Sequence, residues 1–202
     1  MRPMGNTRAP LRIIVSGGIG SGKSTVMELL QARGVLVIEA DRVGHEVLQP
    51  GGSAYAEVAA QWPQALLDGE VDRARLAAIV FTDDEQLRYL EAITHPHIKR
   101  EIEERVSRHE NRDIAVELPL ATDFLGRGWT RLVVIAPARI RIERAVARGM
   151  DEGDAVNRLE AQPDTSQWAQ DADHVIENRG SLAELAREVD RVWHRMHEPT
   201  SP

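Results

Sequence analysis

Four glycines, three serines and a lysine stand close together in the stretch SGGIGSGKST, residues 16–25. Glycine has no Cβ and tolerates positive φ, so a loop rich in glycine can turn its N–H groups inward around an anion. The pattern G-x-x-x-x-G-K-[ST] is met from Gly17 to Ser24. In this pattern the loop N–H groups cradle phosphates, the lysine reaches the β- and γ-phosphates, and the hydroxyl binds Mg²⁺. The stretch therefore predicts a site for a nucleoside triphosphate.

Two carboxylates, Glu39 and Asp41, follow the apolar run VLVI. Phosphoryl transfer needs a group that orients the attacking hydroxyl and takes its proton, and a carboxylate can do both. At this spacing in an extended segment, both side chains would face the same side of the chain. The alternative is that Asp41 only caps the next helix. We favour the catalytic role, because ligands bind outside the carboxyl ends of parallel strands.

Three arginines, Arg141, Arg144 and Arg148, recur at helical spacing and would share one helix face. Like charges at this spacing cost roughly 0.2–0.5 kcal/mol per pair unless an anion neutralises them, as a triphosphate would. Neighbouring glutamates offer the alternative of ordinary surface ion pairs. A glycine hinge and an acidic stretch follow, so we predict a lid over residues 148–162 that closes on the phosphates.

Five short apolar runs are predicted to be strands of a parallel sheet, buried on both faces. They cover residues 11–15, 35–39, 114–118, 131–136 and 174–177. Helical stretches separate them, and Gly34 is expected to close the first helix. The sequence therefore predicts an α/β protein with a five-stranded parallel sheet and flanking helices.

The gap between the second and third predicted strands is long and has the pattern of helices. The expected helices cover residues 41–48, 54–61, 73–80, 83–94 and 97–110. Thr82 with Glu85 has the spacing of a capping box, as has Ser181 with Glu184 before the last helix. Such an insertion should lie at the carboxyl edge of the sheet.

The composition limits the function further. With 25 basic and 32 acidic residues the net charge is −7, which argues against nucleic acid or a membrane surface as partner. There is no cysteine, which excludes a disulfide framework, a thiolate metal site and a cysteine nucleophile. The first ten residues lack the apolar segment of a signal peptide. We expect a cytoplasmic monomer whose residues 1–10 are flexible.

The phosphate loop alone leaves the reaction open. A GTPase needs a guanine-selecting N-K-x-D, which is absent, although DRVG at 41–44 fits the short pattern D-x-x-G. A kinase acting on a small molecule and a nucleotide-binding switch without an acceptor both remain compatible with the loop.

From Leu11 to about Trp193, the chain resembles the dephospho-CoA kinases. The segments that carry this resemblance are SGGIGSGKST, EADRVGHEVLQPGG, LLDGEVDRARLAAIVF (66–81), THPHI (94–98), ELPLATD (117–123), NRLEAQ (157–162) and ADHVIENRG (172–180), together with Arg144 and Arg148. The resemblance implies a single P-loop kinase domain over residues 11–200. Its core would be 11–40 and 113–197, with a helical acceptor-binding insertion at 41–112. The reaction implied is transfer of the γ-phosphoryl group of ATP to the 3′-hydroxyl of dephospho-CoA, which gives CoA and ADP; another small-molecule acceptor is the alternative.

The resemblance also implies roles for individual residues. The catalytic residues would be Lys23, Asp41, Arg144 and Arg148. ATP would be bound by Gly18, Ile19, Gly20, Ser21, Gly22, Lys23, Ser24, Thr25, Arg144, Arg148, Asn178 and Gly180, with adenine near Asn178. The acceptor would be bound by Asp41, His95, Pro96, Leu118, Pro119 and Leu120. Mg²⁺ would be held by Ser24, and through water by Glu39 and Glu117.

Several positions depart from the pattern of the family. Glu39 and Glu117 stand where aspartate is usual, and Asp123 stands where glutamate is usual. Ala121 replaces a leucine, and Arg141 replaces a frequent glutamine. Each acidic exchange keeps the charge and moves the carboxylate by one methylene.

The first prediction separates Asp41, the expected base, from Glu39, the expected support of Mg²⁺. Asp41→Asn should lower kcat by about 10²–10⁴-fold with little change in ATP affinity, the range for loss of a general base. Glu39→Gln should mainly raise the Mg²⁺ concentration that gives half-maximal rate. Steady-state kinetics over a Mg²⁺ series measures both, and a kcat collapse in Glu39→Gln alone would reverse the two roles.

Overall fold

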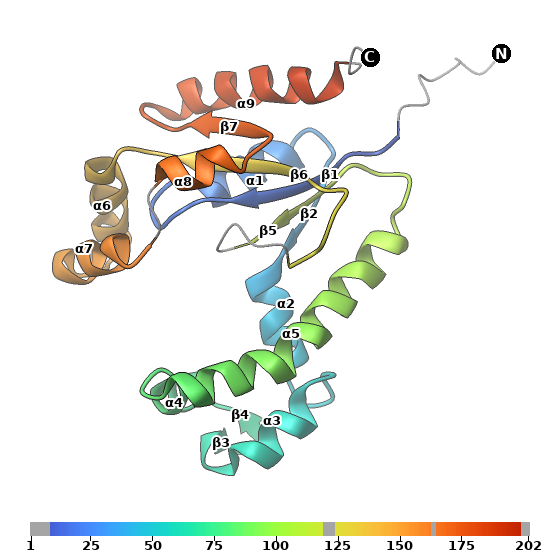
Figure 1. The fold of residues 1–202 in the computed structure, drawn as a ribbon, viewed down its shortest axis with the longest axis vertical. Coiled ribbons are helices and arrows are strands. Elements are labelled where there is room, and N and C mark those ends of the chain that lie inside the picture. The colour runs from blue at the N-terminus through green and yellow to red at the C-terminus, as the bar shows by residue number, and fades with distance from the viewer. Residues whose placement is uncertain (1–8, 119–123, 163–164, 199–202) are drawn as a thin grey trace. The chain divides into compact units, whose positions relative to one another are not determined.

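The computed structural model describes residues 9–118, 124–162 and 165–198 (Figure 1). The chain divides into two compact units, one formed by Met1–Val37 with Asn111–Pro202 and the other by Ile38–Glu110. Each unit has an apolar core of its own. The predicted insertion, residues 41–112, overlaps most of the second unit. Of the segment expected to be flexible, residues 1–8 lie outside the described residues.

Five strands form one parallel sheet in the order β2-β5-β1-β6-β7. They are β1 (Arg12–Ser16), β2 (Leu36–Glu39), β5 (Ile114–Glu117), β6 (Thr130–Ile135) and β7 (His174–Glu177). The five predicted strands are thus confirmed to within one residue at each end. Continuous apolar runs were sufficient to identify them, because strands buried on both faces need apolar side chains at every position.

The register of the sheet sets where its carboxyl ends meet. Val15 of β1 pairs with Glu117 of β5, and Ser16 pairs with Val133 of β6. In the same way Ile135 of β6 pairs with Glu177 of β7. The loops that leave β1, β5, β6 and β7 therefore start from one edge, where ligands bind in open α/β sheets.

Helices cover the sheet of the first unit. One face carries α1 (Lys23–Gln31) and α9 (Leu182–His197), which contact each other and share a core with β1, β6 and β7. On other sides, α8 (Thr165–Gln170) packs against β6, and α6 (Ala138–Ala147) packs against α7 (Glu152–Glu160). The sheet and the helices packed against it hold in place the sheet edge from which the loop after β1 begins.

Two predicted helix boundaries of this unit are confirmed. Ser181 and Glu184 form a capping box at the start of α9, and the hydrogen bonds from Ser181 lower the pKa of the Glu184 carboxyl. Gly34 has a φ of 87° just after α1, and its N–H donates to the Gln31 carbonyl.

The second unit is mainly helical. Its elements are α2 (Ala40–Val47), α3 (Tyr55–Gln61), a 3₁₀ turn (Pro63–Ala65), β3 (Leu66–Leu67), β4 (Glu70–Val71), α4 (Arg73–Val80) and α5 (Asp84–Ser107). Trp62 is 1% exposed, and its indole N–H donates to Gln86 Oε1 at 2.9 Å. Val58, Leu76 and Val80 belong to the same core, which joins α3, α4 and α5.

Two expectations for this unit were wrong. The two helices expected at 83–94 and 97–110 are one helix, α5, with Pro96 inside it. A proline removes one helical hydrogen bond, and the remainder of this helix extends on both sides of it. Asp83 rather than Thr82 caps α5, because Asp83 accepts from the N–H groups of Glu85 and Gln86. The Thr82 hydroxyl instead donates to carbonyls of the preceding turn.

The structure also contains a short hairpin, β3–β4, between the helices predicted at 54–61 and 73–80, where no element had been predicted. Asp68 and Gly69 form its turn with φ values of 50° and 84°. Asp-Gly is a preferred pair for a two-residue hairpin turn, so a local signal was present in the sequence.

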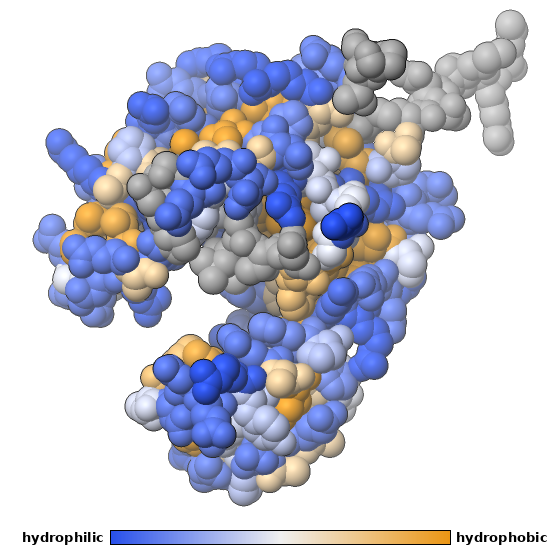
Figure 2. Space-filling view, in the orientation of Figure 1, coloured by the Kyte–Doolittle hydropathy of each residue, from blue (hydrophilic) through white to orange (hydrophobic). Residues whose placement is uncertain are grey.

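Polar and charged side chains cover most of the visible surface of each unit, with smaller groups of apolar side chains between them (Figure 2). Among the described residues, no helix combines the length and the apolar character that crossing a bilayer requires.

Candidate active site

The phosphate loop, Gly17–Ser24, joins β1 to α1. Gly17, Gly20 and Gly22 have φ values of 151°, 70° and 100°, which only glycine adopts readily. The Ser21 N–H donates to the Gly18 carbonyl at 3.2 Å, and α1 begins at Lys23. The loop therefore ends at a helix N-terminus, where free N–H groups and the helix dipole favour an anion.

Glycine is also required because other segments lie directly against the loop. A Cβ on Gly17 would lie 2.3 Å from the Val134 carbonyl oxygen. A Cβ on Gly20 would lie 2.2 Å from the Arg141 carbonyl oxygen, and one on Gly22 would lie 2.2 Å from Asn178 Nδ2. Any side chain at these positions would push the loop away from its supports.

Lys23 and Ser24 stand at the start of α1. Lys23 Nζ donates to the Gly17 carbonyl at 2.8 Å and lies 3.9 Å from Glu117 Oε1. The side chains of Lys23 and Glu117 are 16% and 19% exposed, and Ser24 is exposed. The structure thus brings the predicted lysine close to the predicted carboxylate at the end of β5, and Ser24 follows the lysine in the first turn of α1.

Asn178 supports the loop from the end of β7. Its side chain is buried, Nδ2 donates to the Ser21 carbonyl at 2.8 Å, and Oδ1 accepts from Arg144 Nη2 at 2.9 Å. Its backbone N–H donates to the Ile135 carbonyl. Through these bonds the Asn178 side chain positions both the loop and Arg144.

A cavity of about 370 Å³ opens beside the loop. Its walls are Gly20, Gly22, Thr25, Arg144, Ala147, Arg148, Asn178, Gly180, Leu182 and Leu185. Seven of the residues predicted to bind ATP lie on this one cavity. Its apolar walls and convergent polar groups are typical of a cofactor site.

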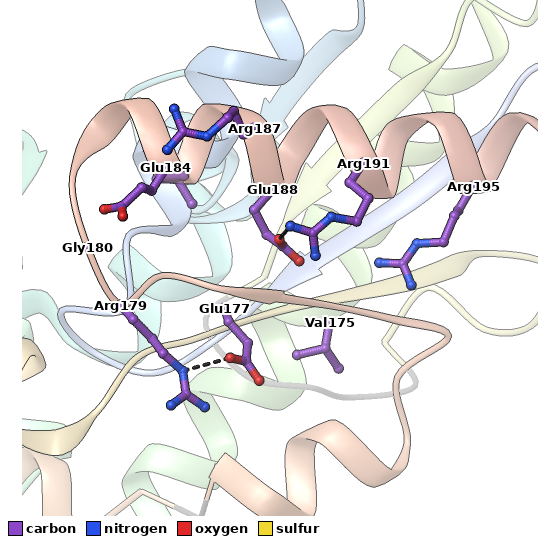
Figure 3. Close-up of a pocket in the computed structure, with 10 residues that line it drawn as sticks. Val175, Glu177, Arg179, Gly180, Glu184, Arg187, Glu188, Arg191 and Arg195 are labelled. Atoms are coloured by element: carbon purple, nitrogen blue, oxygen red, sulfur yellow. Dashed lines mark ion pairs between the residues drawn. The ribbon is translucent and has the colours of Figure 1, made fainter.

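A second cavity, of about 740 Å³, lies between β7 and α9 and is drawn in Figure 3. Four of its charged side chains form two ion pairs: Glu177 with Arg179 and Glu188 with Arg191, each at 2.6 Å. Because no residue of the phosphate loop lines this cavity, the smaller cavity beside the loop is the better candidate for a nucleotide.

Arg141 departs from the arrangement expected for the three arginines. It is 4% exposed, Nε donates to the Ile19 carbonyl at 2.8 Å, and Nη2 donates to Gln162 Oε1 at 2.6 Å. The same Gln162 oxygen accepts from the Ile19 N–H at 3.0 Å. Burial lowers the pKa of the Arg141 guanidinium. Arg141 is therefore a buried support of the phosphate loop and does not share a free helix face with its neighbours.

The other two arginines lie on the cavity. Arg144 is partly buried between the loop and Asn178, whereas Arg148 is exposed at the end of α6. Gly149 follows with a φ of 91°, and α7 occupies most of the predicted lid. Gln162, which spacing arguments did not single out, connects the end of this segment to the loop.

The remaining predicted residues are placed as follows. In the second unit, Glu39 ends β2 and Asp41 lies in the first turn of α2, and both are exposed. The expected extended spacing between them was wrong, because α2 begins directly at Ala40, and Asp41 is not the helix cap. His95 and Pro96 are exposed within α5.

The predicted acceptor residues after β5 are only partly described. Leu118 is 3% exposed, and its N–H donates to the Val15 carbonyl. Pro119 and Leu120 lie outside the described residues, as do Ala121 and Asp123.

The second prediction concerns Arg141. Arg141→Ala would remove two hydrogen bonds from a charged donor, each worth about 1.5–3 kcal/mol, and leave the Ile19 carbonyl without this donor. We expect a lower melting temperature and a KM for ATP raised about tenfold or more, because the loop loses its support.

Arg139→Ala is the matched control, since Arg139 lies on the same helix but is exposed and pairs with Glu143 at 2.7 Å. Thermal unfolding and ATP kinetics should resemble those of the unmodified protein. An Arg141→Ala protein with an unchanged KM for ATP would contradict the supporting role.

Known proteins of one family are similar to this chain over most of its length. The sequence profile of the dephospho-CoA kinase family matches residues 11–184. A dephospho-CoA kinase of Thermobifida fusca is 38% identical over 192 residues, which cover 92% of this chain and 96% of that protein. The crystal structure of TT1252 from Thermus thermophilus superposes with a TM-score of 0.82 at 34% identity, covering 94% of this chain and 99% of the other.

A dephospho-CoA kinase from Campylobacter jejuni superposes with a TM-score of 0.63 at 27% identity, covering 91% of this chain and 96% of the other. The family profile covers both the phosphate loop and the segment that contains Asn178 and Gly180. This chain belongs to the dephospho-CoA kinase family.

Proposed function

We propose that this protein transfers the γ-phosphoryl group of ATP to the 3′-hydroxyl of dephospho-CoA, which yields CoA and ADP as the last step of CoA biosynthesis. Membership of the family is the observation that carries the proposal. The phosphate loop, with its lysine and its adjoining cavity, supplies the site that ATP needs.

The residues of the first unit would bind and polarise the triphosphate. Loop N–H groups and the N-terminus of α1 would hold phosphate oxygens. Lys23 would exchange the Gly17 carbonyl for the β- and γ-phosphates, and Arg144 and Arg148 line the cavity beside the loop. The adenine would occupy the part of the cavity near Gly180. A lid over residues 148–162 would exclude water from the phosphates.

The residues fit a magnesium ion. Ser24 presents an exposed hydroxyl, and Glu117 presents a carboxylate near Lys23, so oxygen donors are available. Among the described residues no cluster of three histidine, cysteine or acidic side chains could hold a metal by itself, which suits an ion that keeps waters and phosphate ligands. Mg²⁺ bound there would neutralise charge on the β- and γ-phosphates. Glu39 and Glu117 would act on it through water.

Asp41 would complete the reaction from the second unit. Its carboxylate would accept the proton of the 3′-hydroxyl and orient that oxygen for attack on the γ-phosphorus. The bond from the γ-phosphorus to the bridging oxygen of ADP breaks as the new bond forms. His95, Pro96 and the segment 118–120 would contact the acceptor. We further propose that the protein works as a monomer in the cytoplasm, without nucleic acid or membrane as partner.

The third prediction tests this function directly. ADP formation from ATP should depend on dephospho-CoA, and Lys23→Ala should lower the rate by about 10²–10³-fold, the cost of losing one preorganised contact to developing charge. Strong dependence on the acceptor would eliminate a nucleotide switch.

Lys99→Ala offers a matched control, because Lys99 is the second lysine of the chain and pairs with Glu103 at 4.0 Å on the surface of α5. Its rate should be close to that of the unmodified protein. If a folded Lys23→Ala protein kept more than about a tenth of the activity, the role of the loop lysine would be refuted.

A further inference from the structure

A small cavity in the second unit has the chemistry of an anion site that the proposed mechanism does not use. It measures about 230 Å³ and lies between the end of α2, the hairpin strand β4 and the start of α4. Its walls are His45, Leu48, Gln49, Pro50, Glu70, Val71 and Arg73. It is smaller than the roughly 300–1,000 Å³ of a site for a whole drug-sized ligand, so it suits one group of a larger molecule.

Arg73 supplies the positive charge of this cavity. Its Nη1 lies 3.3 Å from His45 Nδ1, and among the described residues it has no ion pair with a carboxylate. Glu70 lines the same cavity, and it too has no ion pair within the part of the chain that the structure describes. By contrast, Arg75 of the same helix pairs with Asp72 at 3.6 Å. The charge of Arg73 is thus left for a ligand, and arginine matches the geometry of phosphate oxygens.

His45 adds a second donor. A guanidinium only donates hydrogen bonds, so Nδ1 of His45 must accept in this contact. A neutral imidazole that accepts at Nδ1 carries its proton at Nε2, which is left as a donor. The side chains of Arg73 and His45 together could hold two oxygens of one anionic group.

The position of His45 relates the cavity to the proposed base. Asp41 and His45 are four residues apart in α2, so they lie on one helix face, separated by one turn of about 5.4 Å. In dephospho-CoA the diphosphate is attached next to the ribose ring, a few bonds from the 3′-hydroxyl. An acceptor whose hydroxyl meets Asp41 would therefore bring its diphosphate to the level of His45 and Arg73.

We propose that Arg73 and His45 bind the diphosphate of dephospho-CoA and so position its 3′-hydroxyl at Asp41. This assignment rests on the function proposed above. It gives the second unit a reason to prefer an acceptor that carries a diphosphate over a neutral nucleoside, which has no anionic group for Arg73.

The test is the effect of Arg73→Ala on the two substrates separately. The KM for dephospho-CoA should rise about 10-fold to 100-fold, the range for losing hydrogen bonds to a charged group, while the KM for ATP stays within about twofold. Arg73→Lys, which keeps the charge, should recover part of the loss. Arg75→Ala is the matched control and should change neither KM by more than about twofold.

Glu70→Gln should change the KM for dephospho-CoA in the opposite direction to Arg73→Ala. Removing a carboxylate from the cavity should lower the KM for the anionic acceptor by about twofold to fivefold, whereas a purely structural role of Arg73 predicts no gain. Thermal unfolding of each variant shows whether the substitution affects folding. We expect no such effect for Arg73→Ala, because Arg73 is exposed.

The outcomes separate the two proposals. If the unmodified protein forms no ADP in response to dephospho-CoA, the proposed function is wrong and this assignment falls with it. If that reaction is present but Arg73→Ala behaves like Arg75→Ala, or raises both KM values equally, only the diphosphate site is overturned.

Discussion

The phosphate loop can approach an anion closely only because its own backbone is closely packed from behind. Where a Cβ would stand on Gly17, Gly20 or Gly22, the structure has a carbonyl or an amide of another segment. The Ser21 carbonyl of this loop accepts a hydrogen bond from the buried side chain of Asn178. Without such a partner, a buried carbonyl would cost about 1–3 kcal/mol. The shape of the site thus depends on neighbouring segments that hold the loop from behind.

This dependence explains which parts of the site the sequence could reveal. The loop and the strands were predictable because their signals are local: a motif of fixed spacing, and apolar runs with the length of strands. The role of Arg141 was not predictable in this way. Helical spacing showed that Arg141 shares a face with Arg144, but it does not show what that face meets. Only the fold brings the Ile19 carbonyl and Gln162 to the Arg141 guanidinium.

In the second unit, neighbouring residues can each favour a different helix boundary. Thr82 and Asp83 are both good helix caps, and the capping-box spacing favoured the threonine, yet the aspartate provides the cap. The argument that placed Glu39 and Asp41 on one side assumed an extended chain, and it failed because a helix begins between them. Such boundaries are decided by packing, which a single sequence reports poorly.

In this acidic protein, two arginines of the site keep their positive charge because their partners are neutral. Arg144 and Arg141 donate to amide and carbonyl oxygens, whereas Lys23 donates to the Gly17 carbonyl and also lies 3.9 Å from Glu117 Oε1. Elsewhere arginines pair with carboxylates, as Arg139 does with Glu143. A neutral acceptor fixes the direction of a cation without cancelling its charge, whereas a carboxylate cancels most of it. The contact between Arg73 and His45 follows the same rule, which is why a net charge of −7 is compatible with binding highly anionic substrates.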